Sequence, residues 1–146
     1  MTISLDCERV AKRLSQEFPG SVLAVEKPAI VLEIERLREV AEFLKTSPEF
    51  ELDYLANLTA VDYLDYFEVV YHLVSLTHNH GLMLKVRCYE RTKPMVPSVV
   101  DVWRAADFQE REVYDLMGIV FKGHPNLKRL FLWEGFEGHP LRKDYL

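Results

Sequence analysis

Cysteine is scarce in this chain: it contains only Cys7 and Cys88, which are far apart and form no CxxC pair. A standard iron–sulfur cluster needs four cysteine ligands, so the chain cannot hold one alone. Two cysteines also provide no disulfide framework. Cys7 falls on the apolar face of an expected helix and Cys88 falls within an expected strand, which predicts two small core residues.

Long apolar runs are absent as well. No window approaches the roughly 20 apolar residues that span a bilayer. The first residues, MTISLDCERV, lack the basic start and apolar stretch of a secretory signal. We therefore expect a cytoplasmic protein whose contact with any membrane is indirect, through a partner. The net charge of −5, without a run of Lys and Arg, argues against nucleic acid as a partner.

The common motifs of catalysis and metal binding are also missing. There is no GxGxxG, Walker loop, GxSxG or HExxH sequence, so nothing predicts a nucleotide site or an activated nucleophile. The five histidines are His72, His78, His80, His124 and His139. They form no compact cluster with cysteine or carboxylate, so we expect no metal site. His124 and His139 each stand within a Gly-His-Pro triplet, which favours a role in holding turns.

What is present is an ordinary globular composition, with 49% hydrophobic and 28% charged residues. Periodicity predicts helices at 6–18 and 36–46 and strands at 21–26, 29–34, 52–63, 67–78 and 82–89. In the second strand one face is expected to be more buried than the other. Asn79-His80-Gly81 supplies the turn of a hairpin between the last two strands. This α-β-β-α-β-β-β order predicts an α+β fold: a two-layer α/β domain with helices on one face of a mixed sheet.

From Pro94 onward the pattern changes. A helical segment is expected over 99–117, interrupted near Ala105-Ala106, and after Gly118 follows an irregular tail rich in Gly, Pro, aromatic and charged residues. Long irregular stretches in compact domains are usually functional or ordered by a partner. We therefore divide the chain into a two-layer core, residues 1–95, and a helix plus extended tail of the same domain, residues 96–146.

An acidic residue stands inside the apolar stripe of this helix. The stripe comprises Trp103, Ala106, Val113, Tyr114 and Met117, with Glu110 in its middle. A carboxylate buried there needs donors, because an unpaired one costs several kcal/mol. We expect the tail to be held to Glu110 by its own basic residues, Lys128, Arg129, Arg142 and Lys143.

The other acids of the helix allow further interpretations. Glu110 and Glu112 invite an acid–base hypothesis, but residues two apart on a helix point to different sides and cannot share one substrate. Arg111 and Asp115, four apart, are expected to pair on a third face or to reach a partner protein.

Three motifs in the second half of the chain carry a family resemblance: EREVYDLMGI at 110–119, GHPNLKRL at 123–130 and GHPLRKDY at 138–145. Together with VPSVVDVWRAADFQ at 96–109 and LTAVDY at 58–63, they closely resemble the 30-kDa-type subunit of respiratory NADH:quinone oxidoreductases (complex I). The resemblance covers most of the chain but is dense only from about residue 96.

The resemblance implies a peripheral-arm subunit without a redox centre or active site of its own. It implies packing against the hydrogenase-like large subunit near the quinone site, beside iron–sulfur subunits, on the cytoplasmic side of the cell membrane. The FMN, iron–sulfur clusters and quinone of the parent complex would then be bound by other subunits. The residues implied to fix the tail and meet neighbours are Glu110, Arg111, Glu112, Tyr114, Asp115, Gly118, His124, Pro125, Lys128, Arg129, His139, Pro140, Arg142, Lys143 and Asp144.

The sequence departs from the family pattern at its end. It stops at Leu146, directly after RKDY, whereas many family members continue. The resemblance therefore leaves open the equivalent subunit of an energy-converting hydrogenase or a related dehydrogenase. A different class of function is a free-standing small metal-dependent enzyme that uses Glu110, Glu112 and nearby histidines. Retention of a stoichiometric transition metal would favour that class.

Overall fold

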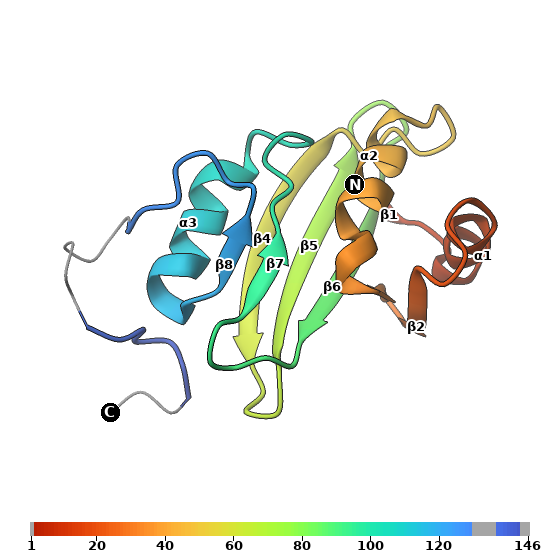
Figure 1. The fold of residues 1–146 in the computed structure, drawn as a ribbon. Helices are drawn as coiled ribbons and strands as arrows, with labels where there is room; N and C mark the ends of the chain where they lie inside the picture. The colour runs from red at the N-terminus through yellow and green to blue at the C-terminus, as the bar shows by residue number, and fades with distance from the viewer. Residues whose placement is uncertain (1, 130–136, 144–146) are drawn as a thin grey trace.

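The computed structural model describes residues 2–129 and 137–143, and its fold is shown in Figure 1. The elements follow in the order β1 (Ile3–Ser4), α1 (Cys7–Glu17), β2 (Val22–Glu26), β3 (Ala29–Leu32), the short 3-10 helix η1 (Ile34–Arg36), α2 (Leu37–Thr46), β4 (Tyr54–Asp62), β5 (Phe67–Ser75), β6 (His80–Cys88), β7 (Met95–Pro97), α3 (Ala106–Met117) and β8 (Val120–Lys122). The predicted α+β class and the α-β-β-α-β-β-β order of the major elements are confirmed.

The main sheet is mixed, as predicted. Its strand order is β2-β3-β6-β5-β4, and the short β1 also pairs with β6. β3 and β1 run parallel to β6, whereas β4, β5 and β6 form an antiparallel meander. In Figure 1, α2 and the small β7–β8 sheet lie in front of the long strands, and α3 lies at the side of β4.

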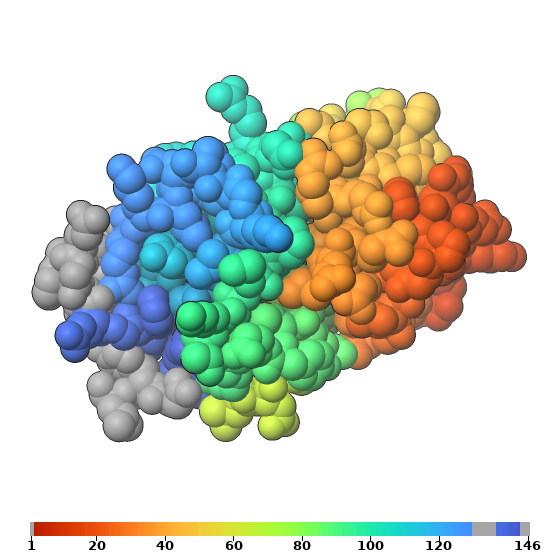
Figure 2. All heavy atoms as spheres, in the orientation of Figure 1, coloured from red at the N-terminus to blue at the C-terminus, as the bar shows by residue number. Residues whose placement is uncertain are grey.

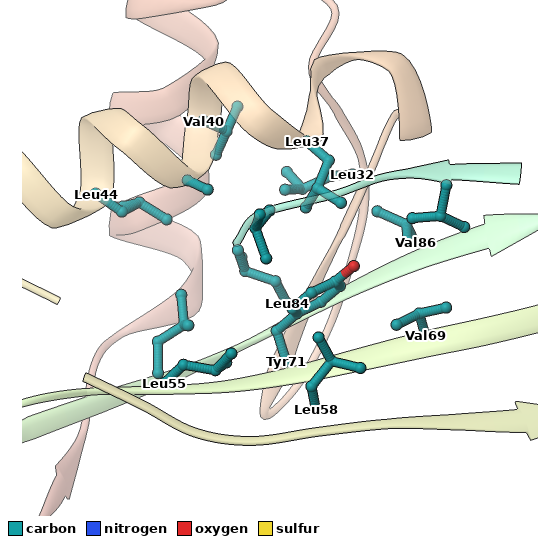
Figure 3. Packing of buried hydrophobic residues seen from close by; sticks show 14 of the residues in the cluster. Leu32, Leu37, Val40, Leu44, Leu55, Leu58, Val69, Tyr71, Leu84 and Val86 are labelled. Carbon is teal, nitrogen blue, oxygen red and sulfur yellow. The ribbon is translucent and has the colours of Figure 1, made fainter. Parts of the chain in front are cut away.

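The core lies between the helices and one face of this sheet. Alternation along β5 and β6 directs a row of apolar residues to that face, among them the paired Tyr71 and Leu84. The apolar stripes of α1 and α2 cover it; Asp6 caps α1 by accepting a hydrogen bond from the Glu8 N–H at 3.1 Å. Figure 3 shows Leu37, Val40 and Leu44 of α2 facing the strands. Each such side chain contributes roughly 1.5–3 kcal/mol through burial.

Both cysteines are buried, as predicted: Cys7 on the inner face of α1 and Cys88 at the end of β6. The hairpin between β5 and β6 is also confirmed, but β6 already begins at His80, with Asn79 in the left-handed conformation at φ 55°. The expectation of one buried face for the second strand is wrong. All four residues of β3 are buried, although only Ile30 and Leu32 belong to the main apolar cluster.

The helix expected over 99–117 is shorter in the structure. α3 begins at Ala106, and the preceding residues form turns in which the N–H groups of Val102 and Trp103 donate to the carbonyl of Val99 at 3.0 and 2.8 Å. The Trp103 ring N–H donates to the Leu52 carbonyl at 2.9 Å, which holds these turns against the core. The short strands β1, β7 and β8 were not predicted, since two or three residues carry no readable period.

Within the described ranges, no helix combines the length and the apolar character needed to cross a membrane.

Candidate functional site

Helix α3 carries two fully buried acids, and the first is Glu110. Its carboxylate accepts hydrogen bonds from the Ser98 hydroxyl at 2.5 Å and from the Val99 N–H at 2.9 Å. Burial raises the pKa of Glu110 to about 7, although both hydrogen bonds act in the opposite direction. Glu110 therefore titrates near neutral pH inside the core.

The prediction that Glu110 holds the basic tail is wrong. The donors come from residues 98 and 99, directly upstream of α3, and not from Lys128, Arg129, Arg142 or Lys143. The chain turns at 99–102 instead of continuing as a helix, and this turn directs the Val99 N–H and the Ser98 hydroxyl at the carboxylate. Glu110 thus fixes the β7–α3 connection.

The second buried acid is Asp115, with 0% of its surface exposed. We expected Asp115 to pair with Arg111 on an outer face of the helix. This expectation is wrong, because Asp115 is buried and its partner is Arg129 of the tail. Its Oδ1 lies 2.7 Å from Nε of Arg129, whose side chain is only 12% exposed. Arg111 instead donates to the carbonyl of Lys128 at 3.4 Å and lies over the ring of Phe108. Asp115, not Glu110, is the acid that binds a basic residue of the tail.

The tail also satisfies the carbonyl groups at the end of α3, which have no partner within the helix. The Gly118 N–H closes the helix on the carbonyl of Tyr114 at 2.9 Å, with Gly118 in the left-handed conformation at φ 77°. The Asp115 carbonyl accepts from Nη2 of Arg129 at 2.9 Å. Arg129 therefore binds both the side chain and the backbone of one residue.

The last two carbonyls of α3 are bound by the segment 137–143. The Leu141 N–H donates to the Leu116 carbonyl at 2.9 Å, and Nε of Arg142 donates to the Met117 carbonyl at 2.6 Å. All four terminal carbonyls of α3 therefore have a partner, and three of the four partners come from the tail. We call this set of contacts, between residues 114–118 and the tail residues 129 and 138–142, the helix–tail junction.

His139 lies inside the helix–tail junction. Its Nδ1 is 3.1 Å from the Asp115 carbonyl and 3.1 Å from Nη2 of Arg129, which also donates to the Gly138 carbonyl at 2.7 Å. Burial lowers the pKa of His139, and the positive charges of Arg142 and Arg129 lower it further. The environment therefore favours the neutral ring, which attaches the second GHP triplet to the end of α3 through the Asp115 carbonyl.

A third buried acid holds the tail at Lys143; it lies within the LTAVDY motif but was not predicted as a site residue. Asp62, 3% exposed, receives Nη1 and Nη2 of Arg91 at 2.7 and 3.0 Å. It also accepts from the backbone N–H groups of Lys143 at 2.9 Å and Leu64 at 2.8 Å. The Arg91 guanidinium is the main cause that holds the pKa of Asp62 well below its usual range. Two guanidinium groups, those of Arg91 and Arg142, lie over the ring of Phe67, at 4.5 and 5.1 Å.

The remaining predicted residues are distributed around this junction. His124 holds the first GHP turn, as predicted: its Nδ1 accepts from the Asn126 N–H at 3.0 Å, and its Nε2 lies 3.0 Å from Asp107 Oδ1. Glu112 is exposed, on a different side of α3 from Glu110. Pro125 and Lys128 are exposed, whereas Tyr114 and Pro140 are half-buried. Asp144 lies outside the described residues.

The histidines near the β5–β6 hairpin contact the backbone. The rings of His78 and His80 stack with centroids 5.2 Å apart, and their Nε2 atoms lie 3.1 and 2.7 Å from the carbonyls of Pro48 and Phe50. In the described ranges, no group of three or more His, Cys, Asp or Glu residues is placed to hold a metal ion.

Comparison with known proteins shows to which family the motifs at this junction belong. Residues 30–146 match the model of the family described as the respiratory-chain NADH dehydrogenase 30 Kd subunit. The chain belongs to this family. An NADH-quinone oxidoreductase subunit from Roseiflexus castenholzii is 43% identical over 149 residues, which cover 97% of this chain and 85% of that protein. The corresponding protein from Coxiella burnetii is 36% identical over 172 residues, covering 94% and 75%.

Two solved structures share the fold of this 30-kDa-subunit family member. The trypsin-resistant fragment 1–134 of Nqo5 is 36% identical, with a TM-score of 0.66 over 82% of this chain and 98% of that one. A chain of the membrane-bound sulfane sulfur reductase, an archaeal respiratory membrane complex, is 26% identical, with a TM-score of 0.75 over 94% and 84%. The protein is therefore a subunit of a complex of the NADH-quinone oxidoreductase type.

Proposed function

We propose that this chain is a structural subunit of the peripheral arm, without an active site of its own, that supports the hydrogenase-like large subunit near the quinone site. The helix–tail junction is the observation that carries this proposal. Its buried acid Asp115 and its basic residues contact one another and the backbone, and Asp62 binds the backbone of Lys143 nearby, so these groups serve to fix the tail. A tail fixed at several points can present one shape to a neighbouring subunit before it binds.

The surface around the junction supports an interface role. Phe108 of α3 and Leu141 of the tail are 61% and 59% exposed. Obligate interfaces are larger and more apolar than ordinary protein surface, and they are enriched in aromatic residues. These two side chains would be covered on assembly, which would remove apolar surface from water on both sides of the tail.

The redox groups belong, in this proposal, to other subunits. FMN, the iron–sulfur clusters and quinone would be bound by the partners, among them the hydrogenase-like large subunit and the iron–sulfur subunits. The two cysteines are consistent with this, since both are buried and lie in different elements. Membrane contact would be indirect, through the same partners, on the cytoplasmic side of the cell membrane.

A second candidate is the equivalent subunit of another membrane-bound respiratory complex, such as an energy-converting hydrogenase or a related dehydrogenase. The likeness to a chain of the membrane-bound sulfane sulfur reductase favours it, because that likeness extends over 94% of the present chain. Both candidates give the chain the same supporting role and differ in the electron donor and acceptor.

Purification from native membranes tests the proposal. The chain is tagged at its N-terminus in its host, the membranes are solubilised gently, and copurifying proteins are identified by mass spectrometry. We expect a hydrogenase-like large subunit together with iron–sulfur subunits. A flavin-containing NADH-oxidising subunit in the same fraction selects the first candidate, and hydrogenase-type or other donor subunits select the second. Recovery of the chain alone from the soluble fraction would overturn both, and stoichiometric bound metal in that material would favour the enzyme hypothesis.

A further inference from the structure

A groove of about 570 Å³ lies beside the β7–α3 connection, away from the contacts between α3 and the segment 137–143. Its walls come from α2, from residues 97–107 and from residues 122–125. Figure 2 shows these parts of α2, the β7–α3 connection and the segment after β8 meeting on the viewer's face of the molecule. The groove thus joins parts of the chain that are far apart in sequence.

One of the two acids in the wall of the groove is paired with a cation of the chain. Asp101 receives Nη2 and Nε of Arg38 at 2.6 and 3.0 Å. Oδ1 of Asp107 lies 3.0 Å from Nε2 of His124. Asp101 is therefore paired with a cation of the chain, whereas Oδ1 of Asp107 has no hydrogen-bond partner among the described residues and pairs with His124 only when that ring is protonated.

Two cations in the wall of the groove lack such partners. Arg104 and Lys122 are exposed and line the groove; Arg104 precedes α3 in the sequence and Lys122 follows it. Neither side chain forms a hydrogen bond or an ion pair with any residue of the described ranges. Because Arg38 is paired with Asp101, these two cations face only the carboxylate of Asp107, and the groove keeps a net positive charge in a chain whose net charge is −5.

The other walls of the groove suit a peptide. Pro97, Val100 and Pro125 supply apolar surface between the cations. Cavities of roughly 300–1,000 Å³ enclose ligands of drug size, which corresponds to a few extended amino-acid residues. An isolated inorganic anion would leave the apolar walls uncovered, whereas a short segment with acidic and apolar side chains would cover them.

We propose that this groove binds an acidic segment of a neighbouring subunit, with its carboxylates on Arg104 and Lys122. The planar guanidinium of Arg104 can hold one carboxylate through two parallel hydrogen bonds, and Lys122 acts as a point charge for another. This inference rests on the proposed function, because it names the chemistry of the partner in the assembly. The complementary charges would also orient the two subunits before they meet.

The first test is charge reversal in the native complex. Arg104→Glu with Lys122→Glu is compared with Arg9→Glu combined with Lys12→Glu, which makes the same charge change at two exposed positions of α1. Both variants are tagged and recovered at low and moderate salt, and their folding is checked by thermal unfolding of the purified chains. We expect the groove variant to recover its neighbours about ten-fold less than the parent, and the α1 variant to lose less than about two-fold. The deficit relative to the parent should shrink as salt rises, because salt screens both the attraction in the parent and the repulsion in the variant.

The second test is carbodiimide cross-linking of the intact parent complex, which joins an amine to a carboxylate in direct contact. We expect an amide between Nζ of Lys122 and an Asp or Glu of another subunit, identified by peptide mass spectrometry. Equal recovery of neighbours by the groove and α1 variants would overturn the proposal, and so would cross-links of Lys122 only within its own chain. If the tagged parent chain recovered no neighbours at all, the proposed function itself would fail; if it recovered them and only the variants behaved alike, the groove proposal alone would fail.

Discussion

Each half of α3 contains one buried acid, Glu110 in the first half and Asp115 in the second, and the two acids have different partners. Glu110 is bound by neutral groups directly upstream, and its pKa rises to about 7 because burial outweighs these two hydrogen bonds. Asp115 is bound by a guanidinium from the tail. The first half of α3 is therefore fixed by the core, whereas its second half depends on whether the tail is in place.

The largest expected effect is at the tail-dependent end. Asp115→Asn leaves the largely buried Arg129 without its charge partner, and breaking one member of a buried pair destabilises by about 3–5 kcal/mol. We expect a loss in that range in the free energy of unfolding, measured by urea denaturation of the purified chain. Trypsin cleavage at the tail residues Arg129, Arg142 and Lys143 should accelerate in parallel.

Glu112→Gln is the matched control, because it removes a charge from an exposed position on the same helix. Its effect should stay within about 0.5 kcal/mol. If Asp115→Asn and Glu112→Gln were equally stable and equally resistant to trypsin, the tail-dependence of this end of the helix would be refuted.

The next effect concerns pH and belongs to the core-dependent end. The folded-state pKa of Glu110, about 7, lies above its ordinary value of 4.5. Between these values the folded chain binds more protons than the unfolded chain, so the contribution of Glu110 to stability falls as pH rises through this window. The loss is on the order of 3 kcal/mol and is complete above pH 7.

Glu110→Gln isolates this contribution, because a neutral amide can still accept from Val99 and contact Ser98. Urea denaturation at pH 5 and pH 8 should show the variant close to the parent at pH 5 and more stable than the parent at pH 8, with trypsin resistance of the tail unchanged. If the parent were instead more stable than the variant and this difference in the free energy of unfolding grew with pH, a positive charge would have to stabilise the ionised carboxylate of Glu110.

Sequence pattern was sufficient for the helices and longer strands of the first 90 residues, and insufficient for the short strands, for the start of α3 and for the partners of the buried acids. The alternation in β5 and β6 and the apolar stripes of α1 and α2 depend on local period, and they predicted the sheet and its covered face. The same reasoning marked Glu110 as buried but assigned it the wrong donors. A helical wheel shows which side chains point inward and carries no information on which distant residue meets them.

Asp62 shows most clearly that sequence pattern does not predict contacts between distant residues. It stands at the end of β4 in an alternating strand, so its inward position could be predicted, yet one of its partners is the backbone of Lys143, 81 residues away. The sequence offered two signals, an acid on the inner face of a strand and its place in the LTAVDY motif, and neither indicates which residue Asp62 contacts. The groove beside Arg104 is likewise a tertiary feature, since its walls come from three separate segments.

A moderate effect is expected where the two regions touch, at Gly118. A Cβ built on Gly118 would lie 2.6 Å from Nη2 of Arg142, and the residue has φ +77°, so Gly118→Ala combines backbone strain with displacement of the tail. Gly20→Ala is the control, because φ there is +83° and no atom lies within 4 Å of the added Cβ. We expect about 1 kcal/mol for the control and roughly 1–2 kcal/mol more for Gly118→Ala, with faster trypsin cleavage of the tail in that variant alone. Equal losses in both would show that the tail does not rest on this glycine.

The smallest expected change in stability is at Tyr71, and it tests whether water enters the core beside Glu110. The hydroxyl of Tyr71 is buried without a hydrogen-bond partner among the described residues, and Figure 3 shows it surrounded by aliphatic side chains. Burial, with a smaller contribution from the charge of Glu110, raises the pKa of Tyr71 well above its ordinary value. Because an unsatisfied buried hydroxyl is unfavourable, Tyr71→Phe should raise the free energy of unfolding by up to about 1 kcal/mol in urea denaturation. Tyr114→Phe, at a half-buried position on α3, should change it by less than about 0.5 kcal/mol. A loss of more than about 1 kcal/mol in Tyr71→Phe would mean that the hydroxyl donates to a partner in solution, and the core-dependent end of α3 would then contain water.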